Sequence, residues 1–370
     1  YIPLMNNSLE VITLTKNTLR EAVSHNKYWG NSYEAPFSKN KARWLLENNR
    51  AEDDDVLAIL GYENHTIVAF VALVPDWIEN KAGDVKKIFW SQRWWASDTY
   101  KDTILPTYVK SISLKECNNQ VVIKFLGDNT KAYYEKQPFT KFSERNRYII
   151  IFSLNYDILV YKKKSLKKIA PLLKLFDASS RKVISIINTL KAKKRTQNLD
   201  IEYINSVDKD TWDYIEKHCA HDVIPKTQDY INWQICNNQY HVVKDKASKP
   251  YYNCLLGSIS NKIYNMNFLV KKENDIIGFI SGFVSGKRFT VRYFFANDDN
   301  FDYCVDALIT NFIKERCTLL QTENSMLGQR IKSKYLTVYT DAKQLFSLIH
   351  NDVRTDVANA IINDQDGNFL

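Results

Sequence analysis

Glycine is scarce in this sequence, with only 10 glycines among 370 residues. Neither a G-x-x-x-x-G-K-[ST] phosphate loop nor a G-x-S-x-G nucleophile turn is present. These absences exclude nucleotide hydrolysis and serine hydrolysis of the kinds that depend on such turns. A phosphate-binding loop that contains no glycine would lack the conformational freedom that this residue gives the backbone.

Cysteines and long apolar runs are also few. The six cysteines form no C-x-x-C pair, and the two closest, Cys304 and Cys317, lie thirteen residues apart. This pattern predicts a reduced, cytoplasmic protein rather than a disulfide framework. The longest apolar stretch, Tyr148 to Tyr161, contains Asn155 and Asp157, and it is too short to span a bilayer.

Positive charge is concentrated in one segment. The chain carries a net charge of +9, whereas Lys162 to Arg195 holds twelve Lys or Arg and one acid, Asp177, which gives this segment +11 and the remainder −2. Its lysines interleave with apolar rather than aromatic residues, so the segment is interpreted as a solvated basic face in preference to a nucleic-acid surface. An anionic membrane and an acyl-tRNA remain alternative partners for it.

Two other clusters invite a functional interpretation. The run His218-Cys219-Ala220-His221-Asp222 contains metal-ligating side chains, but no second cluster completes a set of four ligands, and we expect no metal. The acidic run Glu52-Asp53-Asp54-Asp55 could attract a cationic acceptor. A solvated loop that follows a helix is the favoured interpretation of that run.

The first 150 residues alternate between strand and helix patterns. The apolar runs Val56–Tyr62 and Thr66–Val74 flank Glu63-Asn64-His65, which predicts a hairpin with Asn in the turn. The aromatic run Phe89–Ala96 predicts a strand. A helix through Leu114, a strand at 120–126, a helix ending near Tyr134 and a strand at 147–154 are predicted to follow. This order predicts an α/β fold around a mixed sheet.

The second half repeats this order. It contains two helical patterns, a predicted hairpin at 263–270 and 276–284, a strand at 289–295, a helix at 303–317 and a strand at 318–322. Apolar residues at helical spacing within 161–198 predict two further amphipathic helices. We therefore predict two tandem domains of one fold, residues 1–160 and 201–370, joined by a basic helical linker at 161–200.

The segment that follows Phe89–Ala96 has the layout of a phosphate-binding turn. Consecutive backbone N–H groups at the start of a helix can hold a pyrophosphate. Here Asp102 would bring a negative charge next to the phosphates, and Pro106 lacks a backbone donor. The matching turn of the second half, 297–302, is more acidic and also lacks glycine, so no cofactor is expected there.

This organisation resembles the GCN5-related N-acetyltransferase (GNAT) superfamily, whose strand-to-helix turn holds the coenzyme A pyrophosphate. When Tyr100-Lys101 is aligned with the Tyr-Arg of that family, three other residues, Asp102, Ile104 and Pro106, fall where glycines are expected. A second departure is Pro138, at a position where Gly commonly precedes Phe. Nearly the full length also resembles a group of Bacteroides-type two-domain proteins of the superfamily. The segments that carry this likeness are Leu14-Thr15-Lys16, residues 49–56, Pro75-Asp76-Trp77, Trp94-Trp95, Tyr134-Glu135-Lys136 and residues 364–367.

The resemblance implies a site and a cofactor, acetyl-CoA or another acyl-CoA. The positions that match the coenzyme-binding segment are Trp94, Trp95, Ala96, Lys101, Asp102, Thr103, Ile104 and Leu105. Tyr134 matches the general acid that protonates the leaving thiolate, and a phenol with a pKa of about 10 can donate to a thiolate. The competing interpretation is that Tyr133 or Tyr134 only packs the helix on the sheet. Strand alternation predicts Trp90 and Trp94 on one face and Trp95 on the other.

The leading hypothesis is an acyl-CoA-dependent N-acetyltransferase whose acceptor, a small amine or amino sugar, binds between the halves. Two alternatives stay open. A non-catalytic binding protein could retain the GNAT fold with an altered coenzyme A site, which the glycine-free turns favour. A FemAB-like aminoacyl-tRNA-dependent transferase could use the basic linker to bind RNA. The sequence does not define the oligomeric state.

Overall fold

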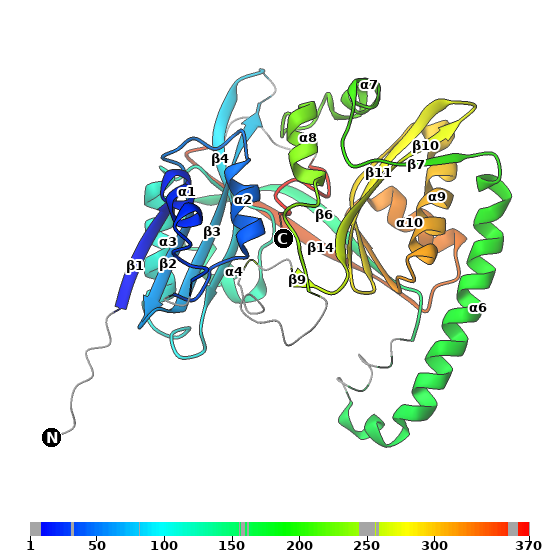
Figure 1. The fold of residues 1–370 in the computed structure, drawn as a ribbon, viewed down its shortest axis with the longest axis horizontal. Coiled ribbons are helices and arrows are strands. Elements are labelled where there is room, and N and C mark those ends of the chain that lie inside the picture. Colours follow the sequence, from blue (N-terminus) through cyan, green and yellow to red (C-terminus); the bar gives the residue numbers. More distant parts are fainter. Residues whose placement is uncertain are drawn as a thin grey trace.

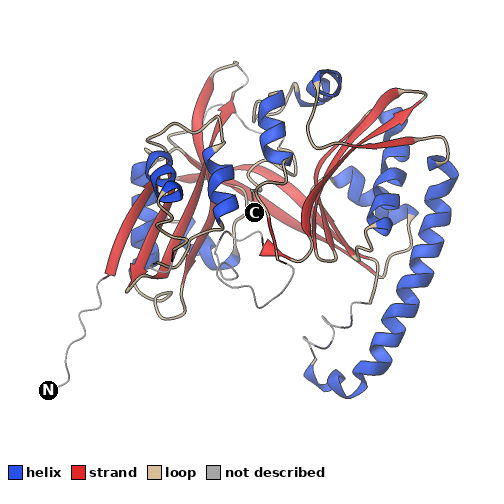
Figure 2. Cartoon of the chain, in the orientation of Figure 1, coloured by secondary structure: helices blue, strands red, loops and turns tan. Residues whose placement is uncertain are grey.

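A single mixed sheet of 12 strands runs through the molecule, and helices cover both of its faces (Figure 1, Figure 2). This computed structural model describes residues 9–30, 33–80, 82–154, 156, 160, 163–243, 256, 259–353 and 362–369. Five residues of patterns discussed above lie outside these ranges: Asn155, Asp157, Tyr161, Lys162 and Cys254. The predicted α/β fold with a mixed sheet is confirmed.

The first half begins at the outer edge of this sheet. Its elements are β1 (Leu9–Thr15), α1 (Lys16–Ser24), α2 (Lys39–Leu46), β2 (Val56–Glu63), β3 (Thr66–Glu79), β4 (Val85–Ala96), α3 (Leu105–Glu116), β5 (Val121–Ile123), α4 (Asp128–Tyr134) and β6 (Phe139–Ile151). A 3₁₀ turn, η1 (Lys164–Ile169), and the long helix α6 (Ala170–Thr196) follow.

The second half repeats the order of the first. Its elements are β7 (Asp200–Tyr203), α7 (Lys209–Cys219), α8 (Gln228–Ile235), β10 (Ile263–Lys272), β11 (Asp275–Ser285), β12 (Arg288–Ala296), α9 (Phe301–Lys314), β13 (Leu319–Thr322), α10 (Ser325–Lys334) and β14 (Tyr339–His350). The short strands β8 (His241–Val242) and β9 (Ile259–Ser260) and the 3₁₀ turn η2 (Asp298–Asn300) are additions to that order.

The two halves exchange their last strands. The strand order is β1-β2-β3-β4-β5-β14-β6-β13-β12-β11-β10-β7, so β14 of the second half pairs with β5 of the first, and β6 of the first pairs with β13 of the second. In the centre, β6 and β14 are antiparallel from Phe139↔His350 to Ile151↔Tyr339. If each strand is replaced by its counterpart in the other half, the same order results when it is read from the opposite edge of the sheet. The sheet therefore has an approximate twofold axis between β6 and β14.

Local sequence signals explain where many of these elements begin and turn. Thr15, Ser38 and Thr227 cap α1, α2 and α8, since each side chain accepts a hydrogen bond from a backbone N–H in the first turn. Asn64 has a positive φ in the β2–β3 turn, and Asn274 does the same between β10 and β11. Both hairpins predicted from the sequence are therefore confirmed.

Three elements differ from the sequence predictions. The two predicted helices of 161–198 are one helix, α6, because Pro171 stands at its start and no Gly or Pro interrupts it before Thr196. β6 begins at Phe139 rather than at 147, because pairing with β14 extends it. β14 itself was not predicted.

The core is divided by the sheet. In the first half, α1 and α2 cover one face, in a cluster that includes Leu19, Trp44 and Trp90, and α3 and α4 cover the other, in a cluster that includes Val109 and Tyr134. The second half has the same layers, with α7 and α8 on one face and α9, α10 and α6 on the other. The two halves thus carry matched helix layers on a shared sheet.

Candidate functional site

The site suggested by the sequence lies where β4 and β5 part. The two strands are parallel and pair only at Phe89↔Val121 and Trp90↔Val122. β5 ends at Ile123, whereas β4 continues to Ala96. Backbone groups of β4 beyond Trp90 are therefore not paired with β5, and an extended substrate could approach them.

A β-bulge on β4 changes which residues face this opening. The register with β3 passes from Ala72↔Arg93 to Leu73↔Ser91, so Gln92 is an extra residue. Trp94 consequently packs with the α3–α4 core, whereas Trp90 and Trp95 belong to the α1–α2 core. The predicted sharing of a face by Trp90 and Trp94 is therefore wrong, because the bulge shifts the alternation by one residue.

Three polar side chains meet just beyond the last β4–β5 pair. Lys110 of α3 donates from Nζ to Ser91 Oγ of β4 at 3.1 Å. The Ser91 hydroxyl is also near enough to the Tyr134 hydroxyl, at the end of α4, to lower the pKa of that phenol. The Lys110 ammonium lies 5.8 Å from the centre of the Tyr134 ring. An amine, a hydroxyl and a phenol therefore lie close together at this point of the sheet.

Burial shapes the acid–base properties of this cluster. Lys110 is fully buried, and desolvation lowers its pKa to about 8, only weakly opposed by Cys117. Desolvation, with a smaller contribution from Tyr133, raises the pKa of Tyr134, and the nearby Ser91 hydroxyl acts in the opposite direction. Tyr134 is therefore a neutral phenol at pH 7, next to an amine that can change protonation near that pH.

Tyr134 also lines a cavity of about 300 Å³ between α4, β6 and β14. Its walls include Leu126, Phe139 and Phe346, and Lys141 lies at its rim with the ammonium 4.2 Å from the centre of the Phe346 ring. Because β14 belongs to the second half, this cavity is shared by both halves. Tyr134 is only 4% exposed and makes edge contacts with Phe139 and Tyr133, so it packs α4 on the sheet as well.

The predicted coenzyme-binding residues surround the start of α3. Trp94 donates from its indole to the Pro106 carbonyl at 2.9 Å, and Lys101 pairs with Asp98 at 3.1 Å. Asp102 and Thr103 are exposed, and Ile104 is 82% exposed. Ala96 and Leu105 pack with the α3–α4 core, and Trp95 packs on the opposite face. Of the predicted residues on β4, Trp94 and Ala96 thus lie on the α3 side of the sheet and Trp95 lies on the other.

The backbone of this turn is not a glycine-type phosphate cradle. No residue of the fully described turn 97–106 has a positive φ. The Leu105 N–H donates to Thr103 Oγ1 at 3.3 Å, and Pro106 has no N–H to offer. For binding a phosphate, the turn offers a helix N-terminus and the exposed Lys101 ammonium. At the first two positions of α3, however, the Leu105 N–H is already engaged and Pro106 has none. The fit to a pyrophosphate is therefore partial.

The corresponding turn of the second half is occupied by its own ion pairs. Asp302, in the first turn of α9, accepts from Arg195 at 2.6 Å and pairs with Arg330 at 3.1 Å. The start of α9 therefore carries a carboxylate held by two arginines, and no side chain caps the helix there.

The C-terminal segment 362–369 lies between the halves (Figure 1). Gln92 exchanges two hydrogen bonds of 3.2 Å with it, one to the Gly367 carbonyl and one from the Phe369 N–H. Arg292, the extra residue of the matching bulge on β12, donates to the Asn368 carbonyl at 2.5 Å. Gly367 has a φ of +59°, and a Cβ there would lie 2.4 Å from the Trp90 ring. Both bulges therefore hold the same short segment.

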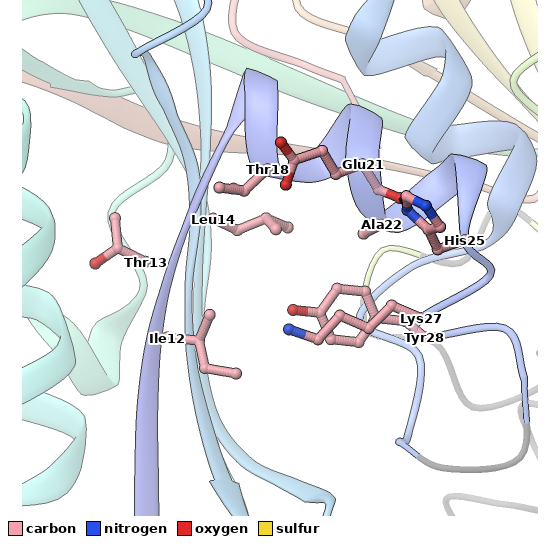
Figure 3. A pocket seen from close by; sticks show the side chains of 9 residues that line it. All are labelled: Ile12, Thr13, Leu14, Thr18, Glu21, Ala22, His25, Lys27 and Tyr28. Carbon is pink, nitrogen blue, oxygen red and sulfur yellow. Dashed lines mark hydrogen bonds between the residues drawn. The ribbon is translucent and has the colours of Figure 1, made fainter.

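A second cavity, of about 260 Å³, lies beside β1 and α1 (Figure 3). Figure 3 shows Glu21 and His25 above Tyr28 and Lys27, while Thr13 points to the other side of the strand. Tyr28 belongs to the α1–α2 core, on the face of the sheet opposite Tyr134. This cavity is thus separate from the site at β4 and β5.

The metal-like run of the second half has structural partners. His218 Nδ1 lies 3.0 Å from the Tyr214 carbonyl, and Asp222 pairs with Lys226 at 3.6 Å. Within the part of the chain that the structure describes, no three His, Cys, Asp or Glu side chains converge as metal ligands, and no helix is both long and apolar enough to cross a membrane.

Comparison with known proteins identifies the fold. No protein family model matches the sequence, and no curated protein does. The structure is similar to Saccharomyces cerevisiae N-myristoyltransferase, solved with bound myristoyl-CoA and inhibitors, with a TM-score of 0.50 and 11% identity over 94% of this chain and 81% of that one.

Two GCN5-related N-acetyltransferases are also similar to this chain. The protein from Kribbella flavida gives a TM-score of 0.46 at 9% identity, over 92% of this chain and 70% of that one. The protein from Anabaena variabilis gives 0.46 at 8%, over 93% and 74%. What these comparisons share with this chain is fold alone, because every identity is 11% or lower.

Sequence reasoning missed Ser91, Lys110 and Gln92. A signal for Lys110 was present, since it follows Val109 and precedes Leu114 by four residues, on the apolar face of α3. A lysine on that face is rarely buried without a polar partner. Ser91 and Gln92 gave no such signal, because the bulge depends on pairing with β3.

Proposed function

We propose that this protein is an acyl-CoA-dependent N-acyltransferase that acts on a small amine or amino-sugar acceptor. The observation that carries this proposal is the cluster of Lys110, Ser91 and Tyr134 where β4 and β5 part, in which Lys110 donates a hydrogen bond to Ser91. The similarity to N-myristoyltransferase supports the fold on which such a site would be built, and nothing finer. Within the GNAT superfamily, the resemblance to Bacteroides-type two-domain proteins remains part of the proposal.

In this reaction the acceptor amine attacks a thioester carbonyl, the C–S bond breaks, and the leaving thiolate takes up a proton. Tyr134 would donate that proton. A phenol whose pKa is raised by burial is a weak donor, but Lys110, with a pKa of about 8, can restore its proton through the Ser91 hydroxyl. Trp94, Lys101 and Thr103 would hold the coenzyme along the start of α3, with the helix N-terminus toward its phosphates.

The proposed domain division follows the repeated order of elements. Residues 1–160 and 201–370 would be two GNAT-like domains, and 161–200 the basic helical linker. The exchange of β6 and β14 means that each domain would complete its sheet with a strand of the other. The acceptor would lie near the cavity at Tyr134, to which both domains contribute.

A non-catalytic binding protein is the second candidate, and specific observations favour it. The turn 97–106 lacks positive φ values, and Pro106 removes a donor. The segment 362–369 also occupies the β4 bulge at Gln92. A protein that retains the fold but no longer binds coenzyme A would be compatible with both features.

Turnover assays with a matched pair of tyrosine variants test the proposal. Release of free thiol from acetyl-CoA is measured across a panel of small amines and amino sugars. Tyr134→Phe should lower kcat by about 10²–10⁴-fold while changing coenzyme A affinity little, because it removes only the proton donor. Tyr133→Phe, on the adjacent residue, should retain most activity. Equal turnover in wild type and Tyr134→Phe would exclude the assigned role.

A further inference from the structure

Helix α6 carries an apolar stripe that faces solvent. Its members are Leu172, Leu175, Phe176, Val183, Ile186 and Leu190, which are 51–67% exposed. Leu172, Phe176, Val183 and Leu190 follow one another at four, seven and seven residues, and Leu175 and Ile186 lie beside them, so the set shares one side of the helix. Single exposed apolar residues are ordinary, but this set extends over about 27 Å of one helix, in two groups that the exposed Ser179 separates.

The other side of α6 is fixed to the body of the protein. Its buried residues are Asp177, Ile184, Asn188 and Ala192. Asn188 both donates to and accepts from the backbone of Leu336, at 2.9 and 2.8 Å. Arg195 pairs with Asp302 of α9 at 2.6 Å. Because this anchored side is nearly opposite the stripe, α6 presents the stripe outward, along the outer edge of the molecule (Figure 1).

A basic cavity of about 790 Å³ lies between the anchored side and the stripe. Five cationic side chains line it: Arg181 and Lys182 from α6, Lys262, Lys287 and Arg316. One carboxylate, Glu315, also lines it and pairs with Lys262 at 3.1 Å. Lys182 directly precedes Val183, so the cavity opens next to the apolar stripe. An anionic group bound there would lie at the edge of an apolar surface.

The charge around the stripe selects among possible partners. Lys168, Lys174, Lys182, Lys193 and Lys194 are exposed, and the segment 162–195 has a net charge of +11. A second copy of this chain would bring the same positive charge against it. RNA would match the charge but would leave six apolar side chains uncovered. An anionic lipid surface complements both features, since lysine stems can lie along acyl chains while their ammonium groups reach phosphates.

We propose that α6 docks on the surface of an anionic phospholipid membrane. The stripe enters the boundary between headgroups and acyl chains, with the helix axis parallel to the surface. The cavity at Arg181, Lys182 and Lys287 receives a lipid phosphate. This proposal is independent of the acyltransfer reaction, because α6 contributes no residue to the Tyr134 site.

Vesicle co-sedimentation of the full chain tests this docking. Vesicles of phosphatidylcholine with about 30% phosphatidylglycerol should bind at least about tenfold more protein than vesicles of phosphatidylcholine alone, and about 0.5 M salt should weaken binding. The variant L172Q/F176Q/L190Q should lose about tenfold in binding while keeping its helix, because Gln is a good helix former. The variant K182E/K287E should lose binding to anionic vesicles to a similar extent.

The matched control replaces three exposed apolar residues elsewhere, V85Q/Y108Q/V242Q, and should bind vesicles like the wild type. Circular dichroism checks that each variant remains folded. Equal vesicle binding by the stripe variant and the control would overturn the proposal, as would absence of binding by the wild type. A dimer in sedimentation velocity that L172Q/F176Q/L190Q dissolves, or binding of RNA or inorganic phosphate without vesicle binding, would likewise overturn it.

Discussion

Trp44 and Trp233 stack with ring centroids 4.2 Å apart, and each indole N–H donates to the main-chain carbonyl of the other at 2.7 and 2.8 Å. Trp44 lies in α2 and Trp233 in α8, which hold corresponding places in the two halves. The contact is therefore reciprocal, as expected for residues on either side of an approximate twofold axis. It joins the helix layers of the two halves, as β6 and β14 join their sheets.

We expect Trp44→Phe and Trp233→Phe each to lower the free energy of unfolding by about 1–3 kcal/mol, because each leaves a buried carbonyl without its donor. In the double variant the two losses should not add, with a coupling energy of about 0.5–3 kcal/mol. Urea unfolding of the four proteins measures this. Trp77→Phe, at a half-exposed tryptophan, is the control and should cost less. Strict additivity would show that the two indoles do not act as a pair.

Glu323 is the acidic centre of the contact between halves. It pairs with Arg145 at 2.9 Å, Arg147 at 2.8 Å and Lys124 at 3.4 Å. Burial alone would raise the pKa of Glu323, but the three cations outweigh it and lower the pKa to about 2. Because this pKa lies below that of the unfolded chain, about 4.3, the stabilisation is complete above pH 4.3 and is lost as pH falls toward 2.

Glu323→Gln should therefore cost about 3–5 kcal/mol at pH 7, since it leaves buried cations without their counter-charge. Glu144→Gln, which removes a partly exposed partner of Lys141, should cost less than about 1 kcal/mol. Chemical denaturation of both variants provides the comparison. A cost for Glu323→Gln no larger than that for Glu144→Gln would contradict the assigned role of the ionic centre.

Replacement of Lys110 should raise the stability of the protein and lower its activity. Desolvation lowers its pKa to about 8, below the value of about 10.4 in the unfolded chain. The resulting penalty on folding is complete below pH 8 and disappears as pH rises toward 10.4, so wild-type stability should increase over that interval. Lys110→Met should then gain about 1–2 kcal/mol at pH 7 and lose this pH dependence.

The same variant should lose most of its turnover, because the proton supply to Ser91 and Tyr134 is removed. Lys115→Met, at an exposed lysine of the same helix, is the control and should change neither property. Urea unfolding at pH 7 and 9.5, together with the turnover assay, measures both effects. If Lys110→Met raised the stability but left turnover unchanged, Lys110 would have no role in proton transfer.

Much of the fold could be predicted because its signals are local. Asn64 and Asn274 mark two hairpins, and the aromatic strand before α3 fixes the position of the proposed site. β14 escaped prediction because its first half is largely exposed and carries charged residues such as Asp341 and Lys343. It is ordered by pairing with β6, a relationship between residues about two hundred positions apart that no local pattern contains.

The site was predictable only in part for a related reason. Tyr134 and the α3 turn were suggested by the resemblance to the GNAT superfamily, and their role stays a prediction, whereas the absence of glycine from the turn is visible in the sequence. The face of each β4 residue depends on the bulge at Gln92, which requires a partner strand. The contacts of 362–369 with Gln92 and Arg292 bring together residues from three distant parts of the chain. Only the folded arrangement reveals them.

The most direct test of the central claim, that the α3 turn and Tyr134 serve acyl-CoA, is thermal unfolding with and without acetyl-CoA. Ligand at about one hundred times its dissociation constant should stabilise the protein by about 2.7 kcal/mol, which gives a measurable rise in Tm. Thr103→Glu, which puts a negative charge beside the proposed phosphates, should abolish the rise. No change in Tm with either acetyl-CoA or free coenzyme A would contradict the account and favour the non-catalytic binding protein.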